Sequence, residues 1–318
     1  MRVEDIRTIC NLGTGTMGHA TALMFALAGY QVRLYGRTAA SLERGYQSID
    51  AALATYRAHK LIAGEDGEAA RRRIAGVTTL EAAADGADFV IESIAEDLAV
   101  KREVFAKLDR LCPRHTIFAT NTSGLSPSAI AEALDRKDKF VAANFWNPPH
   151  LLPLVEVMPG RGTSRTTVDI TWQLLEKIGK KPVAINKETP GFIGNRLQMA
   201  TLREAFHIVE SGIASAEAVD TAVKYSLGRR WGVAGPLESA DMGGLDIFYH
   251  IAETLFPELC DSHKAPRLLE EAMHKGALGA KTGQGLYQWT PERLAKVRDK
   301  REAALIEWLG KDKQETEE

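Results

Sequence analysis

A glycine-rich turn near the N-terminus constrains the fold of this chain more than any other feature. The sequence GTGTMG at residues 13–18 follows a short β-type run, Ile6 to Asn11, and opens an apolar helical stretch that continues to about Leu27. A strand, a turn with GxGxxG spacing and a helix begin a βαβ unit in which the glycines let the backbone approach a pyrophosphate at the helix N-terminus. We therefore predict that a dinucleotide contacts Gly13, Gly15, Thr16, Met17 and Gly18.

The order of elements after this turn predicts an α/β fold. Stretches rich in Ala, Leu, Glu and Arg separate β-type runs, and beyond Pro190 the β pattern stops and the sequence becomes helical. This alternation predicts a Rossmann-type, doubly wound and mostly parallel sheet, followed by an all-helical C-terminal domain. We expect a dinucleotide-binding domain at residues 1–186 and a helical substrate and dimerisation domain at 187–318 that ends in an extension helix. The β-type runs lie at 31–35, 88–92, 116–120, 139–145, 154–157 and 182–185.

Composition places the chain among ordinary globular proteins. Of its 318 residues, 45% are hydrophobic and 26% are charged, and the formal net charge is -2. This balance does not favour nucleic acid as a partner, and no apolar run approaches the roughly 18 residues that span a bilayer. Three scattered cysteines and eight histidines without HExxH spacing predict no disulfide and no metal site. Because the N-terminus leads into the glycine turn rather than a cleavage site, we expect a cytoplasmic protein.

The residue that ends the second predicted strand bears on which nicotinamide dinucleotide is bound. In NAD-binding domains an acidic side chain at this position hydrogen-bonds the adenosine ribose. This chain has Gly36 there, followed by Arg37 and Thr38. Loss of the carboxylate removes repulsion toward a 2′-phosphate, and the arginine offers a charge-assisted contact. The sequence therefore favours NADP over NAD, and the alternative is that Arg37 is a loop cation stacked on adenine.

Segments along most of the chain are similar to a single family. They are DFVIESIAEDLAVK at 88–101, ATNTS at 119–123, NPP at 147–149, LVEV at 154–157, PGFIGNR at 190–196, GPLESAD at 235–241 and KTGQGLY at 281–287. In this order and with no large gap, they resemble the 3-hydroxyacyl-CoA dehydrogenase family. The resemblance covers residues 6 to 290 approximately, and it implies hydride transfer between a nicotinamide and a 3-hydroxy or 3-oxo group.

The resemblance also implies roles for individual residues. In that family a histidine followed by two aromatic or apolar residues and Asn-Pro is the general base, and this chain has Asn144 at its position. The glutamate that orients the base corresponds to Glu156, and the serine that helps to hold the substrate oxygen corresponds to Ser123. Asn195 corresponds to the substrate-side asparagine of the helical domain. The residues expected beside the cofactor are Glu96, Lys101 and Asn121.

Asn144 limits what this site can do. An amide cannot accept a proton at neutral pH, and loss of a positioned base lowers the rate by roughly 10²- to 10⁴-fold. Three interpretations follow: a dehydrogenase silenced by a change at Asn144, an enzyme that reduces an iminium and needs no base, and an NADP-binding protein without turnover. The retained serine and glutamate favour an enzyme. His150, six residues beyond Asn144, is a candidate replacement base.

Two further features concern the substrate and the partner. The charged helix that begins near Trp289 resembles the extension of the free-acid branch that contains lambda-crystallin, gulonate dehydrogenase and carnitine dehydrogenase. The run at 71–73 and Lys60 lie where acyl-CoA members recognise their carrier, although a solvated helix face is the simpler interpretation. We therefore expect a small free acid, with CoA as the alternative. The resemblance implies a homodimer through the helical domain.

Overall fold

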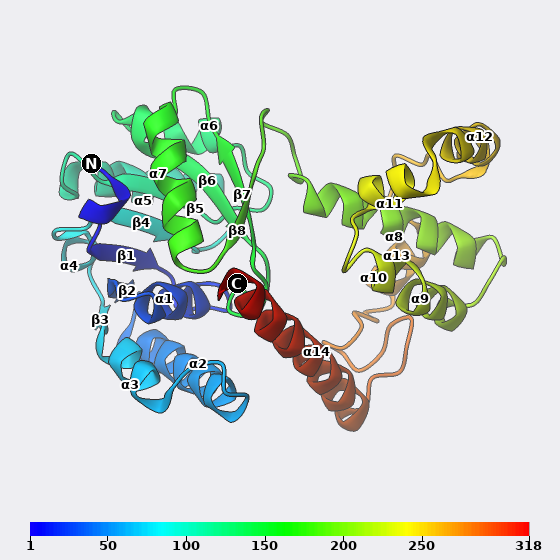
Figure 1. The fold of residues 1–318 in the computed structure, drawn as a ribbon, viewed down its shortest axis with the longest axis horizontal. Coiled ribbons are helices and arrows are strands. Elements are labelled where there is room, and N and C mark those ends of the chain that lie inside the picture. The colour runs from blue at the N-terminus through cyan, green and yellow to red at the C-terminus, as the bar shows by residue number, and fades with distance from the viewer. Residues whose placement is uncertain (318) are drawn as a thin grey trace. The chain divides into compact units, whose positions relative to one another are not determined.

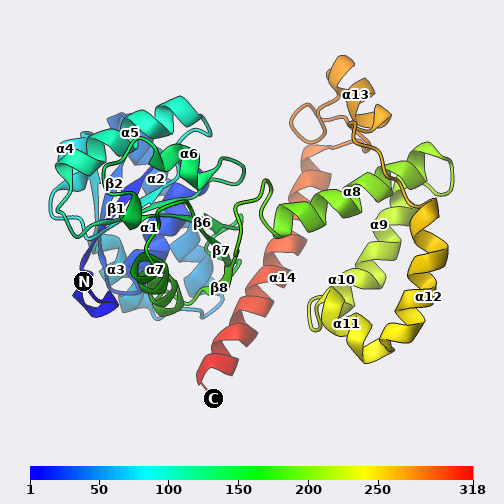
Figure 2. The ribbon, with the colours of Figure 1, turned by 90° about the horizontal axis from the view of Figure 1, so that it is seen from above.

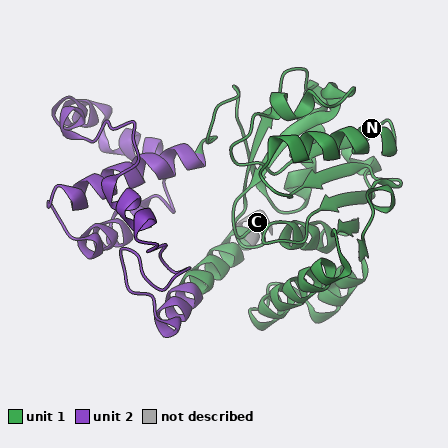
Figure 3. Ribbon diagram, turned by 180° about the vertical axis from the view of Figure 1, so that it is seen from behind, with its two compact units in different colours: residues 1–193, 301–318 green, residues 194–300 purple. Residues whose placement is uncertain are grey.

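The computed structural model describes residues 1–317, without the side chains of 313 and 315–317, and the chain forms two compact units (Figure 3). The first unit contains residues 1–193 and 301–318, and the second contains residues 194–300. This division differs from the expected boundary at 186/187. The backbone N–H of Ile193 still donates to Glu156 of the sheet at 2.8 Å. At the other end of the chain, Ile306 and Leu309 are buried in one cluster with residues of the first unit.

An eight-stranded sheet forms the centre of the first unit (Figure 1). Its order is β3-β2-β1-β4-β5-β6-β7-β8, and every neighbouring pair is parallel except β6 and β7. The chain winds outward from β1 in both directions, which confirms the predicted doubly wound, mostly parallel sheet. The strands are β1 Thr8–Leu12, β2 Gln31–Tyr35, β3 Ile74–Val77, β4 Phe89–Glu92, β5 Ile117–Thr120, β6 Phe140–Phe145, β7 Leu154–Pro159 and β8 Lys181–Ala184.

Helices cover both faces of this sheet (Figures 1 and 2). Successive strand residues point to opposite faces. Ile9 and Ile91 therefore pack with α1, α2, α3 and α7, whereas Cys10 and Val90 pack with α4, α5 and α6. The helices of this unit are η1 Val3–Asp5, α1 Gly18–Leu27, α2 Ala39–Ala58, α3 Gly64–Arg72, α4 Leu80–Ala84, α5 Leu98–Leu111, α6 Pro127–Ala131, η2 Lys137–Lys139 and α7 Arg165–Lys177.

The second unit is helical, as predicted, and none of its residues is buried. The last helix, α14, begins in this unit and ends in the first. Among the described residues, no helix is both long and apolar enough to cross a membrane. The helices are α8 Gly194–Glu210, α9 Ala216–Tyr225, α10 Leu227–Arg230, α11 Pro236–Gly243, α12 Leu245–Leu255, η3 Phe256–Glu258, α13 Arg267–His274 and α14 Pro291–Glu317.

Candidate active site

The glycine turn has the geometry that a dinucleotide phosphate requires. Gly13 has φ +107°, and a Cβ at Gly18 would lie 2.0 Å from the Gly13 carbonyl oxygen, so neither position tolerates a side chain. A Cβ at Gly15 would meet nothing within 4 Å, so the backbone there is open to a ligand. Thr16 and Met17 complete the turn before α1 begins at Gly18. The turn therefore fits the pyrophosphate of a bound dinucleotide at the N-terminus of α1.

Asn11, which sequence reasoning missed, braces this turn from inside β1. Its buried side-chain Nδ2 donates to the carbonyl oxygens of Gly13 at 3.2 Å and Gly18 at 3.0 Å. Its Oδ1 accepts from the Thr21 hydroxyl at 2.8 Å. The available signal was an asparagine in an otherwise apolar strand, because a buried amide needs hydrogen-bond partners.

The end of β2 carries no carboxylate. The Gly36 N–H donates to the Val77 carbonyl at 3.0 Å, and a Cβ on Gly36 would lie 2.7 Å from the Ser41 hydroxyl oxygen. Thr38 caps α2, because its hydroxyl accepts from the Ser41 N–H at 3.1 Å. Arg37 is exposed between them. The end of β2, where the adenosine ribose of a dinucleotide is expected, thus has an exposed cation and no acid.

An ion network with a buried centre lies at the ends of β4 and β5. The Lys101 ammonium is 2.6 Å from Glu92 Oε1 and 3.2 Å from Glu96 Oε2, and Lys101 and Glu92 are at most 1% exposed. Glu96 Oε1 accepts from the Thr122 hydroxyl and from the backbone N–H of Ser123. Burial acts to raise the pKa of Glu96, but the Thr122 hydrogen bond and the Lys101 charge outweigh it and lower the pKa. Lys101 thus fixes Glu96, which in turn holds the loop after β5.

Asn121 ties together the ends of three adjacent strands. Its Nδ2 donates to the Ser93 hydroxyl oxygen after β4 at 3.1 Å, and its Oδ1 accepts from the Phe145 N–H at the end of β6 at 2.7 Å. Ser123 follows in the same loop, and its side chain is exposed with no hydrogen-bond partner among the described residues. The Ser123 hydroxyl is therefore available to a ligand, whereas both polar atoms of the Asn121 side chain are engaged.

Asn144 and Glu156 are direct partners across the antiparallel pair β6–β7. Asn144 Nδ2 donates to Glu156 Oε2 at 2.9 Å, and the indole N–H of Trp146 donates to the same oxygen at 3.1 Å. The other carboxylate oxygen accepts from the Ile193 N–H. Glu156 is fully buried, and Asn144 is 5% exposed. Because the Asn144 amide group donates to Glu156, its Oδ1 is left without a partner among the described residues and can accept from a ligand.

The structure brings most of the predicted catalytic residues to neighbouring strand ends of the first unit. Asn144 and Glu156 lie on β6 and β7, and Ser123 follows β5. Asn195 is in the first turn of α8, and it belongs to the second unit. Trp146 was missed, although it lies two residues beyond Asn144, where strand alternation returns a side chain to the same face.

His150, the candidate replacement base, packs against two aromatic rings of the first unit. Its ring centroid is 6.4 Å from that of His19 and 6.1 Å from that of Tyr56, and its carbonyl accepts from the Tyr56 hydroxyl. Its buried Nδ1 has no partner among the described residues. Burial, followed by the charges of His19 and Lys180, lowers the pKa of His150 to about 4. A group with so low a pKa is a weak base at neutral pH, so the structure does not favour His150 as a replacement for the histidine that the family is expected to have at the position of Asn144.

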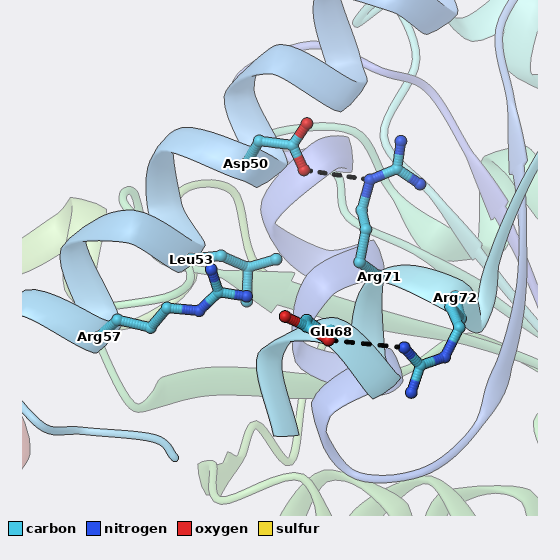
Figure 4. Close-up of a pocket in the computed structure, with 6 residues that line it drawn as sticks. All are labelled: Asp50, Leu53, Arg57, Glu68, Arg71 and Arg72. Carbon is cyan, nitrogen blue, oxygen red and sulfur yellow. Dashed lines mark hydrogen bonds and ion pairs between the residues drawn. The ribbon is translucent and has the colours of Figure 1, made fainter. Parts of the chain in front are cut away.

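Arg71 and Arg72 of the arginine run border a surface pocket of about 360 Å³ between α2 and α3 (Figure 4). Arg71 contacts Asp50 at 3.0 Å, and its guanidinium lies 3.9 Å from the centre of the Tyr46 ring. Arg72 contacts Glu68 at 3.8 Å. Carboxylates therefore offset two of the cations that border this pocket. Its lining residues are Asp50, Leu53, Arg57, Glu68, Arg71 and Arg72.

The fold and these strand-end residues define a nicotinamide-dependent oxidoreductase built from a Rossmann-type unit and a helical unit. A family model described as the 3-hydroxyacyl-CoA dehydrogenase NAD binding domain matches residues 8–189, and the model of the C-terminal domain matches residues 191–289. The chain belongs to the 3-hydroxyacyl-CoA dehydrogenase family, as its motifs predict. The helix α14 begins at Pro291 and therefore lies beyond both matches.

Named relatives act on free acids and on acyl-CoA substrates. The chain is 32% identical over 301 residues to 5-formyl-3-hydroxy-2-methylpyridine 4-carboxylate 5-dehydrogenase of Mesorhizobium japonicum, covering 95% of this chain and 96% of the relative. It is 37% identical over 286 residues to a probable 3-hydroxybutyryl-CoA dehydrogenase of Bacillus subtilis, covering 90% and 98%. A crystal structure of a dehydrogenase of the first kind, described as an NAD+ dependent dismutase, superposes with a TM-score of 0.88 at 32% identity, covering 95% and 96%.

Proposed function

We propose that this chain transfers hydride between a nicotinamide dinucleotide and a small 3-hydroxy or 3-oxo acid, and that Asn144 orients the substrate instead of taking its proton. The observation that carries this proposal is the 2.9 Å hydrogen bond from Asn144 Nδ2 to the buried carboxylate of Glu156. An asparagine held in one orientation offers a fixed acceptor to the substrate. The dinucleotide, when bound, supplies or accepts the hydride.

Two polar groups of the site, the Ser123 hydroxyl and Asn144 Oδ1, can orient a substrate oxygen or nitrogen. The Ser123 hydroxyl is exposed, and it can donate a hydrogen bond to a substrate carbonyl oxygen. Asn144 Oδ1 can accept from a substrate O–H or N–H but cannot take the proton away. Oxidation of an alcohol by this chain is therefore expected to be slow, because the proton must leave to water rather than to a positioned base.

A second candidate function is the reduction of an iminium formed from a 3-oxo acid and an amine. It is favoured by the acceptor character of Asn144, since Nδ2 is committed to Glu156 and only Oδ1 is left for a ligand. A ketone oxygen and Oδ1 are both acceptors, so they repel each other. The N–H of an iminium donates to Oδ1, and the cation already carries the proton that a ketone would need during reduction.

We propose a free acid rather than an acyl-CoA as the substrate. Recognition of a phosphorylated carrier needs cations that are free to pair with phosphate. Two of the arginines that border the pocket between α2 and α3 already contact carboxylates, Arg71 with Asp50 at 3.0 Å and Arg72 with Glu68 at 3.8 Å. Relatives named for carnitine and for a pyridine carboxylate, at 32% identity and with at least 93% of each relative covered, support the same choice.

We also propose that NADP is preferred over NAD. Gly36 removes the carboxylate that would repel a 2′-phosphate, and the exposed Arg37 beside it supplies a cation. The family domain is described as NAD binding, and the related structure is described as NAD+ dependent, so both dinucleotides belong in every assay.

We propose that the chain forms a homodimer through residues 194–300. No residue of this unit is buried, and its helices expose large apolar side chains, among them Val233 at 81%, Leu237 at 84% and Met242 at 79%. Exposed apolar surface of this extent marks an interface. A second copy would cover the same surface on both chains. Sedimentation equilibrium of the whole protein tests this, and a monomer at micromolar concentration would refute it.

We propose a cytoplasmic location. Cys10, Cys112 and Cys260 are all free thiols. Unpaired cysteines fit a reducing compartment better than an oxidising one.

The test of function is NADPH and NADH consumption against a panel of 3-oxo acids and acyl-CoA thioesters, with and without ammonia or methylamine. Turnover of 3-oxo acids without amine supports the oxo-acid function. Turnover that requires amine supports imine reduction instead. No turnover on any member of the panel, together with tight dinucleotide binding, would leave a binding protein and refute both.

A further inference from the structure

A buried lysine outside the described site holds the loop that joins β6 to β7. Lys180 is 5% exposed, and its ammonium donates to the carbonyl oxygens of Pro149 at 2.5 Å and Leu152 at 3.1 Å. This loop begins at Trp146, directly after β6, and ends at Pro153, directly before β7 begins at Leu154. Trp146 is in this loop, and Glu156 is two residues beyond the start of β7, so the loop geometry affects how the Trp146 indole reaches the Glu156 carboxylate that also accepts from Asn144.

No carboxylate among the described residues pairs with Lys180. Its only hydrogen bonds in that part of the chain are to the two loop carbonyls, and burial lowers its pKa to about 7. A buried cation without a counter-ion destabilises a fold, and an apolar side chain of similar length avoids this cost. A lysine at such a position therefore points to a functional role rather than to a contribution to stability.

The loop is held at two further points. The Tyr56 hydroxyl of α2 donates to the His150 carbonyl, and Leu151 is buried against Ile306 and Leu309 of α14. Packing therefore constrains one surface of the loop, and the Lys180 ammonium fixes the carbonyls on either side of His150 and Leu151.

We propose that Lys180 is a positioning residue for this active site: its two hydrogen bonds fix the loop so that Trp146 holds the Glu156 carboxylate, which orients the Asn144 amide. The claim that Lys180 affects catalysis rests on the proposed function. The claim that Lys180 fixes the geometry of the loop does not depend on that function.

The charged form of Lys180 is the form with three N–H donors. Its hydrogen bonds to the Pro149 and Leu152 carbonyls are therefore strongest below about pH 7 and weaken as pH rises through that value. The charge of Lys180 acts on His150 in the loop, His19 on α1 lies 6.4 Å from the His150 ring, and Tyr56 on α2 borders the same cavity as Lys180. Further groups border the same cavity, and they are Asp66 on α3, Lys177 on α7, Lys181 on β8 and Asp312 on α14.

The test compares Lys180→Met and Lys180→Arg with the control Lys181→Met, which removes a neighbouring exposed lysine. The whole protein is labelled with 5-fluorotryptophan, and the Trp146 signal is identified by its loss in Trp146→Phe. We expect the Trp146 ¹⁹F resonance to shift with pH near 7 in the parent and in Lys181→Met. In Lys180→Met and in the permanently charged Lys180→Arg this transition should be absent.

Two further readouts separate positioning from a simple structural role. We expect Lys180→Met to lower kcat by roughly 10- to 100-fold with little change in dinucleotide Kd, because small misplacements of reacting groups have effects of this size. At pH 6 its thermal midpoint should equal or exceed that of the parent, because the buried charge is gone. Lys180→Arg should recover part of kcat.

The outcomes also distinguish this inference from the proposed function. If the parent shows no turnover at all, the proposed function fails, and the ¹⁹F titration alone decides the role of Lys180. An unchanged Trp146 resonance in Lys180→Met would overturn the inference. So would a fall in its thermal midpoint at pH 6 with kcat unchanged, because Lys180 would then be a purely structural residue.

Discussion

Glu156 lies directly opposite Asn144 across the β6–β7 pair and accepts the Asn144 side-chain amide at 2.9 Å. A second donor, the Trp146 indole, reaches the same carboxylate oxygen. The carboxylate therefore decides which end of the Asn144 amide is offered to a substrate. In a family whose members are expected to use a histidine at this position, the orienting group is retained and the base is not.

Asn144→His should restore a general base, because Glu156 is placed to accept the imidazole N–H in the way that it accepts the amide. We expect oxidation of a 3-hydroxy acid to rise by roughly 10²- to 10⁴-fold at pH 8. The measurement is kcat against pH for the parent, Asn144→His and the control Asn144→Ala. If histidine and alanine give the same low rate, Glu156 does not orient a base here.

The fold could be predicted largely from the sequence because its signals are local. Seven strands follow apolar β-type runs, and the predicted ranges agree with the observed ones to within two residues at each end. β3 was missed, since Ile74–Val77 contains an exposed alanine and glycine that give it no strand pattern. The packing of Ile306 and Leu309 on the first unit was also missed, because nothing within α14 identifies its distant partner.

The site was predicted in part, for a similar reason. The Asn144 and Glu156 positions follow from motifs at fixed spacing, so the resemblance supplied them. Trp146, Asn11 and Lys180 act through contacts that depend on strand register and on loop geometry. Sequence spacing does not reveal that Lys180, directly before β8, donates to carbonyls 31 and 28 residues earlier.

Glu156→Gln should destabilise the fold as well as the site. The carboxylate accepts hydrogen bonds from Asn144, Trp146 and Ile193, and an amide would turn an N–H₂ toward at least one of these donors. We expect a loss of about 1 to 3 kcal/mol in the free energy of unfolding, the range for a buried unsatisfied group. Urea denaturation at pH 7 measures it. An unchanged urea midpoint would contradict the assigned hydrogen bonds.

Lys101→Met should be among the most destabilising single changes in the first unit. It removes the cation from between Glu92 and Glu96 and leaves Glu92, which is 0% exposed, without its charge partner. Breaking a buried pair in this way costs about 3 to 5 kcal/mol. The matched control is Lys107→Met, since Lys107 pairs with Glu103 on the surface of the same helix, where pairs are worth about 0 to 1 kcal/mol. Equal urea midpoints for the two variants would show that the contacts of Lys101 with Glu92 and Glu96 stabilise the fold no more than a surface ion pair does.

Arg37→Ala tests the choice of dinucleotide. If Arg37 contacts a 2′-phosphate, NADPH should bind roughly 10- to 100-fold more weakly, as expected for loss of a charge-assisted hydrogen bond, and NADH should bind as before. Dinucleotide fluorescence gives both Kd values. Arg110→Ala, an exposed arginine at the end of α5, is the control. Equal weakening of NADPH and NADH in Arg37→Ala would instead support stacking on adenine.

The lowered pKa of His150 predicts how the free energy of unfolding depends on pH between about 4 and 6.5. Its folded pKa is about 4 and its ordinary value is 6.5, so between these values the unfolded chain binds more protons than the folded one. Stability therefore rises with pH across this window, and at pH 4 about 3 kcal/mol of it is lost. His150→Phe keeps a ring, removes the unpartnered Nδ1 and should flatten the plot of unfolding free energy against pH between 4.5 and 6.5. The exposed His263→Gln is the control, and its profile should follow the parent. A His150→Phe profile as steep as that of the parent would mean that the imidazole is not buried in its neutral form.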